Sequence, residues 1–242
     1  MTPLLAIERV SKRFRGLRAV DGVSCEIMPA QIFAVIGPNG AGKTTLFNVI
    51  AGAFAPDRGS IAFAGERIDG LAPDEICRRG IGRTFQLVRP FPALSVEDNV
   101  IIGAMLRRHD PTVARRRAHE VLVQLDLFGK RHQPASALTL PDRKRLEVAR
   151  ALATRPKLLL LDEVMAGLRP TETDQMVALL RELNRKSGVT ILLIEHVMRA
   201  VMALAARVLV LHHGAAIAEG PPEAVVREPA VVQSYLGAEA VE

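Results

Sequence analysis

Residues Gly37–Thr45 read GPNGAGKTT, and they are the part of the sequence that most directly indicates chemistry. Four residues separate the first and the last glycine, and a lysine and a threonine follow, which is the pattern of a phosphate-binding loop. In such a loop the backbone amides surround an anion, and the N-terminus of the next helix adds partial positive charge. The pattern predicts that Lys43 reaches the β- and γ-phosphates of a nucleotide, that Thr44 holds Mg²⁺ and that Thr45 lies near the α-phosphate. The predicted phosphate-contacting residues are Gly37, Pro38, Asn39, Gly40, Ala41, Gly42, Lys43, Thr44 and Thr45.

A pair of acids directly after an apolar run forms the second candidate site element. Residues 158–163 read LLLLDE, which predicts a buried strand with Asp162 and Glu163 at its carboxyl end. Hydrolysis of a bound nucleotide needs a metal anchor and a group that orients water. We expect Asp162 to lie beside the metal, directly or through water, and Glu163 to position or deprotonate the attacking water. Two acids after a strand can also simply cap the next element, but the upstream phosphate loop favours the catalytic interpretation.

Two further candidates, Gln86 and His196, each follow a predicted strand. In a parallel sheet the carboxyl ends of the strands meet at one edge, where ligands bind. Gln86 is therefore a candidate for orienting water or metal, and His196 is a candidate for contacting the γ-phosphate. Each signal is weak by itself, since a histidine after a strand is more often a structural residue.

The composition bounds the other interpretations. A chain of 242 residues, 49% of them apolar, is long enough for one large α/β domain or two small ones and is not disordered. The net charge of +6 permits nucleic acid, anionic lipid or nucleotide as a partner, but the lack of Trp and the single Tyr argue against base stacking. The densest basic clusters, Arg107–Arg108 and Arg115–Arg117, are typical of the solvated face of a helix pair. Two distant cysteines indicate a reducing compartment rather than a disulfide scaffold.

No segment of the sequence predicts secretion or membrane insertion. The first residues lack the basic start and the apolar block of a signal peptide. No run reaches the roughly 18–20 apolar residues of a membrane helix. The most apolar stretch, residues 197–211, is interrupted by Arg199 and Arg207. We therefore expect a chain that is soluble alone and that can dock on a membrane partner.

The elements that must position these residues alternate between strands and helices. Apolar runs with β-branched residues predict strands, and apolar residues at helical spacing predict helices. The expected strands are 4–10, 20–28, 31–36, 59–64, 66–68, 80–86, 158–161, 189–194, 208–211 and 215–218. The expected helices are 45–51, 73–79, 95–108, 111–128, 143–154, 171–186, 221–227 and 231–236. The helices of 95–128 interrupt the α/β pattern, and an irregular connector, 87–94, leads into them.

Taken together, these residues resemble the nucleotide-binding subunits of ABC transporters over essentially the whole chain. In family terms, GPNGAGKTT is the Walker A loop, and LLLLDE is Walker B with Glu163 as the catalytic glutamate. Gln86 in RTFQ corresponds to the Q-loop, and His196 in LIEHVM corresponds to the switch histidine. Phe14, which alone would be an ordinary half-buried aromatic, then corresponds to the aromatic that stacks on adenine.

The resemblance implies an α/β fold: a P-loop NTPase core with a mostly parallel sheet flanked by helices, an N-terminal antiparallel β subdomain and an inserted α-helical subdomain. It implies one domain, 1–242, in which 1–86 and 137–242 form the nucleotide-binding core. Residues 87–136 would form the helical subdomain that couples to membrane subunits. ATP and Mg²⁺ are the implied cofactors. The implied metal-binding residues are Thr44, Gln86 and Asp162.

Two segments look most like ATPase subunits of branched-chain amino acid importers. They are GIGRTFQLVRPFPALSVEDNV at 80–100 and AEGPPEAVVREPAVVQSYLG at 218–237. The resemblance implies an ATP-hydrolysing subunit that energises import of branched-chain or related amino acids. It also implies that the chain is cytoplasmic, peripheral on the inner face of the cell membrane, and in contact with permease subunits. No nucleic-acid partner is expected. A soluble ABC ATPase acting on DNA or ribosomes is less favoured, because the chain has one Walker A and no long coiled-coil insertion.

One segment departs from the family pattern. The family's signature, usually Leu-Ser-Gly-Gly-Gln, is expected where this chain reads LTLPD, and the RKRLEVARAL that follows matches without a gap. In the family this segment closes on the γ-phosphate held by the other subunit. Pro141 has no N–H to donate, which removes a hydrogen bond worth roughly 1.5–3 kcal/mol, and the carboxylate of Asp142 adds repulsion. We expect a closed site using this segment to be weakened about a hundredfold or more, although Thr139 can keep the hydroxyl contact. The five residues are Leu138, Thr139, Leu140, Pro141 and Asp142.

These observations favour one of two hypotheses. In the first hypothesis the chain forms a heterodimer with a different ATPase subunit. That subunit supplies a normal signature to the site that contains this chain's intact Walker A, Glu163 and His196. The LTLPD segment faces the Walker A of the other subunit. One ATP site is then competent and the other weak; a homodimer stays open. Arg169 and Val164 also depart from frequent family residues and bear on communication between subunits. In the second hypothesis the chain is an ATP-binding structural or regulatory subunit with little hydrolysis.

Overall fold

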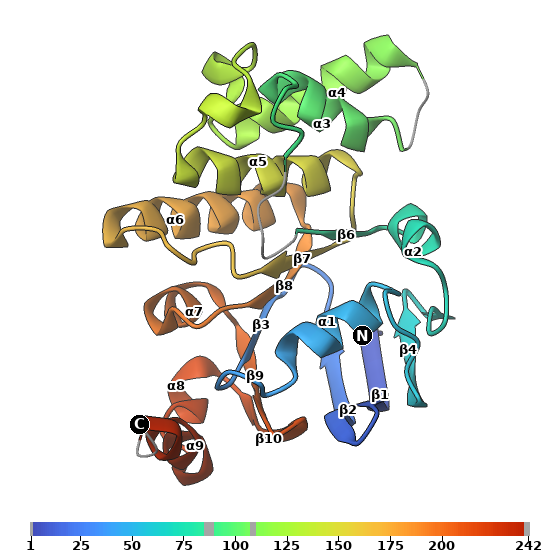
Figure 1. Cartoon of the computed structure of the whole chain (residues 1–242), viewed down its shortest axis with the longest axis vertical. Coiled ribbons are helices and arrows are strands. Elements are labelled where there is room, and N and C mark those ends of the chain that lie inside the picture. Colours follow the sequence, from blue (N-terminus) through green and yellow to red (C-terminus); the bar gives the residue numbers. More distant parts are fainter. Residues whose placement is uncertain (1, 85–89, 107–109, 240–242) are drawn as a thin grey trace.

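The computed structural model describes residues 2–84, 90–106 and 110–239, and Figure 1 shows its elements arranged around two sheets. The strands are β1 (Leu5–Phe14), β2 (Leu17–Ile27), β3 (Ile32–Ile36), β4 (Arg58–Phe63), β5 (Glu66–Arg67), β6 (Ile81–Arg83), β7 (Leu158–Asp162), β8 (Thr190–Ile194), β9 (Arg207–His212) and β10 (Ala215–Gly220). The α-helices are α1 (Lys43–Ile50), α2 (Pro73–Arg79), α3 (Val96–Ala104), α4 (Pro111–Gln124), α5 (Leu140–Ala153), α6 (Pro170–Ser187), α7 (Met198–Leu204), α8 (Pro222–Val225) and α9 (Pro229–Glu239). Two short 3-10 helices are η1 (Phe128–Lys130) and η2 (Ala135–Ala137).

The larger sheet has six strands in the order β10-β9-β3-β8-β7-β6, all parallel except the edge strand β10. Its central strands are uninterrupted apolar runs because both faces of the sheet are covered. Alternate residues of β3 enter different cores: Ala34 and Ile36 pack with residues of α5 and α6, whereas Phe33 and Val35 pack with residues of α1 and the second sheet. This is the mostly parallel sheet flanked by helices that the sequence predicted.

The second sheet is antiparallel and has the order β2-β1-β4-β5. It corresponds to the N-terminal antiparallel subdomain implied by the resemblance. The expected strands at 59–64 and 66–68 form a hairpin, in which β4 pairs with β5 through Ala62 opposite Arg67 and Phe63 opposite Glu66. The fold class is therefore α/β with an added antiparallel sheet.

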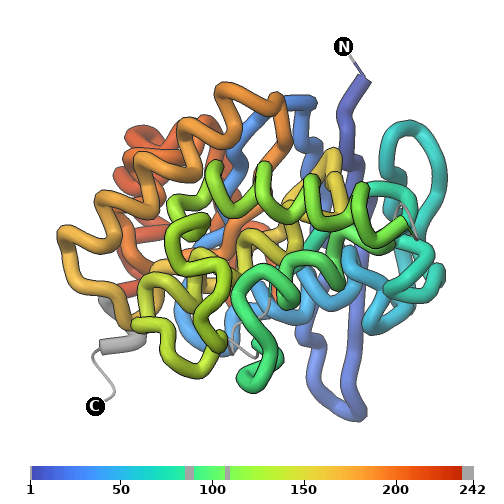
Figure 2. Tube along the Cα trace, turned by 90° about the horizontal axis from the view of Figure 1, so that it is seen from above, coloured from blue at the N-terminus to red at the C-terminus, as the bar shows by residue number. Residues whose placement is uncertain are grey.

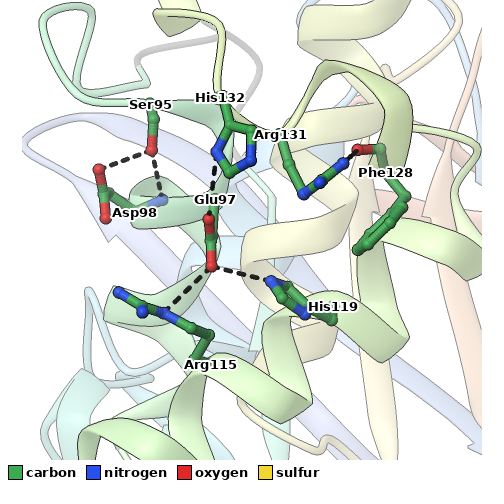
Figure 3. Close-up of polar contacts among 8 residues, drawn as sticks. All are labelled: Ser95, Glu97, Asp98, Arg115, His119, Phe128, Arg131 and His132. Carbon is green, nitrogen blue, oxygen red and sulfur yellow. Dashed lines mark hydrogen bonds and ion pairs between the residues drawn. The ribbon is translucent and has the colours of Figure 1, made fainter.

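A helical layer follows β6 in the chain, and Figure 2 shows its green helices, α3 and α4, lying over the rest of the molecule. Ser95 caps α3, since its Oγ accepts from the Asp98 N–H at 3.0 Å. Glu97 is buried in the first turn of α3, and its Oε1 lies 2.9 Å from His119 Nε2 and 3.2 Å from Arg115 Nε (Figure 3). Its Oε2 lies 3.7 Å from His132 Nδ1. One carboxylate thus ties α3 to α4 and to the segment after η1.

The basic cluster at 115–117 is solvated at two of its three positions, as expected, since Arg115 and Arg116 are exposed. Arg115 faces Glu97, and the Arg117 side chain is largely buried, with its guanidinium donating to the Leu152 carbonyl at 3.1 Å and to Glu120 at 3.3 Å. Arg117 departs from the expectation because α4 packs on α5 and brings the Arg117 guanidinium to the Leu152 carbonyl of that helix. The pair Arg107–Arg108 lies outside the described residues, as do Gln86 and the first residues of the connector, 87–89.

Several helices differ from the expectation in their bounds; α4, for example, ends at Gln124 rather than at 128. Helix α5 begins at Leu140 rather than at 143, because Pro141 fits the first turn, where its missing N–H has no partner to lose. Helix α7 was not predicted; it lies in the apolar stretch interrupted by Arg199. Among the residues that the structure describes, no helix combines the length and the apolar character needed to cross a membrane.

Replacing Glu97 with alanine tests the contribution of this carboxylate to stability. We expect a loss of about 1–3 kcal/mol in the free energy of unfolding, because polar partners from two segments lose their shared acceptor. Urea unfolding followed by circular dichroism measures the change. Glu120→Ala is the matched control, since the Glu120 side chain is 51% exposed and should cost little. Equal midpoints for the two variants would contradict the assigned role.

Candidate functional site

The predicted phosphate loop connects β3 to α1 and requires glycine at two positions. A Cβ on Gly37, at φ +147°, would lie 2.1 Å from the Leu211 carbonyl oxygen, and a Cβ on Gly42, at φ +102°, would lie 2.1 Å from the Ala19 carbonyl oxygen. No side chain fits either space without moving the backbone. The loop is therefore held tightly between β9 and β2, with the N-terminus of α1 directly behind it. This arrangement suits an anion.

The loop borders a pocket of about 370 Å³. Its lining combines backbone of the loop, the first residues of α1 and side chains from β2 and from the end of β7. The lining residues are Leu17, Arg18, Ala19, Asn39, Gly40, Ala41, Gly42, Lys43, Thr44, Thr45, Glu163 and His213. The structure thus brings together most of the predicted nucleotide-contacting residues and the predicted catalytic acid.

Lys43 lies folded against the loop. Its Nζ donates to the Gly37 carbonyl at 2.6 Å and to the Pro38 carbonyl at 2.9 Å. Burial lowers the pKa of the ammonium, and the nearby carboxylates of Glu163 and Asp162 oppose that shift. These two hydrogen bonds hold the Lys43 amine beside the position where the phosphate charge is expected.

Asp162 ends β7 and is 1% exposed. Its Oδ2 lies 3.4 Å from an Arg83 nitrogen, and its backbone N–H donates to Thr84 Oγ1 at 3.1 Å. Burial raises the pKa of this carboxyl, and Arg83 acts in the opposite direction. Its Oδ1 is buried without a hydrogen-bond partner among the described residues. A buried carboxylate oxygen without a partner fits a Mg²⁺ ion or a water bound to it.

Glu163 and His196 face each other across the ends of two neighbouring strands. Glu163 follows β7, His196 lies two residues beyond β8, and 3.9 Å separates Glu163 Oε1 from His196 Nδ1. The Glu163 side chain is mostly buried in the pocket wall, whereas the imidazole is 57% exposed. The exposed ring can turn toward a bound phosphate.

The remaining sequence candidates lie around this centre. Phe14 is at the end of β1, half-exposed, with its ring edge-to-face against Phe54 at 5.1 Å. It is placed beside the pocket rather than in its lining, since it pairs with Leu17, which does line it. Gln86 lies outside the described residues.

The LTLPD segment leads into α5, and the structure changes one part of the expectation. Asp142 is 5% exposed, and its Oδ2 accepts from Thr139 Oγ1 at 2.9 Å and from Lys130 Nζ. The carboxylate is turned into its own chain and largely compensated by an ammonium, so its expected repulsion of a phosphate is reduced. The hydroxyl of Thr139 is engaged in the same contact. The missing N–H of Pro141 is unaffected by this correction.

Sequence reasoning missed two buried charged residues next to the site. Glu195 is 1% exposed, and its Oε1 accepts from the Met165 N–H at 2.9 Å. Lys144 is 5% exposed, and its Nζ donates to the Glu163 carbonyl at 2.9 Å. Burial raises the pKa of Glu195 to about 7 and lowers that of Lys144. The position of an acid between a buried strand and His196 was the available signal for Glu195.

Two family descriptions match the sequence. The family described as ABC transporter matches residues 20–166. A second, described as branched-chain amino acid ATP-binding cassette transporter, matches residues 217–241. The first match spans the phosphate loop and LLLLDE, and the second covers the tail.

Curated relatives are similar over nearly the full chain. The high-affinity branched-chain amino acid transport ATP-binding protein BraF of Pseudomonas aeruginosa is 38% identical over 97% of this chain and 98% of its own. The corresponding protein LivG of Escherichia coli K12 is 38% identical with the same coverage. Among solved structures, an ATP-binding cassette of an ABC transporter in its ADP conformation is 32% identical, with a TM-score of 0.89 over 98% of this chain and 100% of that one. A nucleotide-free cassette is 31% identical, with a TM-score of 0.88 over 97% and 99%.

The pKa of Glu195 predicts a pH-dependent stability. Its pKa rises from 4.5 to about 7 on folding, so the folded chain binds the proton more tightly than the unfolded chain. The stabilisation is complete below about pH 4.5 and is lost as the pH rises to about 7. We expect the melting temperature of Glu195→Gln to rise relative to the wild type between pH 5 and 8, by differential scanning calorimetry.

Glu120→Gln, at an exposed acid, should show no such trend. A constant difference between wild type and Glu195→Gln across this range would contradict the buried, proton-binding state of Glu195.

Proposed function

This chain belongs to the family of ABC transporter ATP-binding proteins, which are ATPases, and from this premise we propose that it energises an importer of branched-chain or related amino acids. One observation carries the proposal: the phosphate loop, Lys43 and Glu163 border a single pocket, with Asp162 and His196 at its edge. The relatives named for branched-chain amino acid transport and the matching tail support the solute class.

In the proposed reaction, the loop amides and the N-terminus of α1 bind the phosphates of ATP. Lys43 exchanges its two loop carbonyls for the β- and γ-phosphates, while Phe14 stacks on the adenine. Mg²⁺ would be held by Thr44, Asp162 and Gln86 and would compensate the charge on the phosphates. These contacts fix the γ-phosphate beside the end of β7.

Hydrolysis then depends on two side chains of this chain. Glu163 orients the attacking water and accepts its proton, for which its position in the pocket wall is suited. His196 turns its exposed ring toward the γ-phosphate, and its contact with Glu163 keeps the two groups aligned. Each role follows the match of this sequence to the family motifs.

We propose the organisation of the chain in the same terms. Residues 1–86 and 137–242 form the nucleotide-binding core, and 87–136 form a helical subdomain that contacts permease subunits. The chain is placed at the inner face of the cell membrane by those subunits.

A heterodimer explains why the catalytic residues are intact while the LTLPD segment is not. In the proposed assembly a second cassette supplies a normal signature to this chain's ATP, giving one competent site. The LTLPD segment faces the second cassette's ATP, where Pro141 lacks the expected N–H, giving one weak site. An ATP-binding structural or regulatory subunit with little hydrolysis is the alternative, favoured by the same segment.

Glu163→Gln tests the catalytic role in the co-assembled cassettes. We expect ATP hydrolysis to fall about a hundredfold or more, because the variant cannot accept the proton of the attacking water. The dissociation constant for ATP should change less than about threefold, since the phosphate loop is untouched. Steady-state phosphate release and equilibrium binding measure the two quantities.

The same substitution in the second cassette is the matched control and should be tolerated better. Hydrolysis that survives Glu163→Gln here but is lost with the equivalent change in the second cassette would contradict the assignment of the competent site.

A further inference from the structure

The turn after β7 holds Glu163 in an uncommon backbone conformation. Glu163 has φ +50°, in the left-handed region that residues other than glycine rarely adopt. The Ala166 N–H donates to the Glu163 carbonyl at 3.2 Å, which closes the turn over residues 163–166. Such a conformation persists only where surrounding contacts hold it. The side chain that leaves the backbone there lines the phosphate pocket.

The end of strand β8 and the residue that follows it, Glu195, accept two hydrogen bonds from the backbone of this turn. The Glu163 N–H donates to the Ile194 carbonyl at 3.0 Å, and the Met165 N–H donates to Glu195 Oε1 at 2.9 Å. The second contact is fully buried, so its loss would leave an amide without water or protein as a partner. The next residue, His196, stays exposed beside the Glu163 carboxylate. The dipeptide Glu195–His196 therefore contacts both the backbone of the turn, at Met165, and the side chain of Glu163.

Helix α5 grips the turn from another side. Lys144 lies in the second turn of α5, and its buried Nζ donates to the Glu163 carbonyl at 2.9 Å. Burial lowers the pKa of this ammonium, and the carboxyl groups of Glu195, Glu163 and Asp162 oppose that shift. Since α5 begins at LTLPD, a single helix connects that segment to the backbone of Glu163.

We propose that Glu195 and Lys144 are positioning residues that hold the 163–166 turn so that the Glu163 carboxylate faces the phosphate loop. Neither residue reaches the pocket itself: neither is part of its lining. They act on the peptide groups at Glu163 and Met165, and they connect the turn to β8 and to α5. The inference rests on the proposed function in one respect, the catalytic role of Glu163.

Four variants separate the hydrogen bonds from the bulk of the side chains. Glu195→Gln keeps an acceptor oxygen for the Met165 N–H, and Glu195→Met keeps only the length. Lys144→Arg keeps a donor, and Lys144→Met removes it. Glu97→Met is the matched control, because it removes another buried carboxylate, in the helical layer and away from the turn.

The first readout is amide hydrogen exchange of the segment 163–168 in the full chain, which needs no turnover. We expect exchange there to rise about tenfold or more in Glu195→Met and Lys144→Met, because an anchored peptide group is released. Glu195→Gln and Lys144→Arg should stay near the wild type. Glu97→Met should lower the melting temperature without changing exchange in this segment.

The second readout is the split between turnover and binding in the co-assembled cassettes. Glu195→Met and Lys144→Met should lose about tenfold or more in kcat, while the dissociation constant for ATP changes less than about threefold. Unchanged exchange at 163–168 would overturn the proposal, as would full kcat in variants whose turn exchanges freely. If the wild type showed no ATP hydrolysis in the co-assembled cassettes, the proposed function would be refuted instead. The hydrogen-exchange measurement would still decide whether Glu195 and Lys144 hold the turn.

Discussion

The site depends on the register of the parallel strands. Val35 of β3 and Asp162 of β7 both lie opposite Ile194 of β8, so the three strands end in one row. The phosphate loop, Glu163 and Glu195 follow these strand ends, so they lie at the same edge of the sheet. Because successive strand residues point to opposite faces, a slip of one residue would exchange the pocket side for the core side. The uninterrupted apolar runs on both faces hold this register.

Burial concentrates opposite charges at this edge before any nucleotide arrives. Lys43 and Arg83 are partly desolvated beside Asp162, and the pKa of each cation is lowered by burial. Their carboxylate neighbours oppose that shift. A triphosphate entering the pocket would replace loop carbonyls as the partner of Lys43, in surroundings where electrostatic interactions are strong. The same surroundings make the orphaned oxygen of Asp162 a suitable contact for a divalent cation.

Local patterns predicted much of this arrangement, and tertiary packing decided the rest. The phosphate loop and the strand ending at Asp162 follow from glycine spacing and apolar runs, so their meeting at one edge was predictable. The contact between Lys130 and Asp142 was not, because it depends on how the segment around η2 returns to the start of α5. Burial of Glu195 was signalled only weakly, by its position between a buried strand and His196, because an acid at the end of a strand usually faces solvent.

We propose that this chain has competent catalytic residues and lacks a competent signature segment of its own. Steady-state ATP hydrolysis by the purified chain alone tests this proposal, beside a variant in which Leu138–Asp142 is changed from LTLPD to LSGGQ. We expect a nearly inactive wild type and a restored variant that hydrolyses ATP about a hundredfold faster. Brisk hydrolysis by the wild type alone would contradict the argument from Pro141, and an inactive restored variant would contradict the competence of the residues around Lys43 and Glu163.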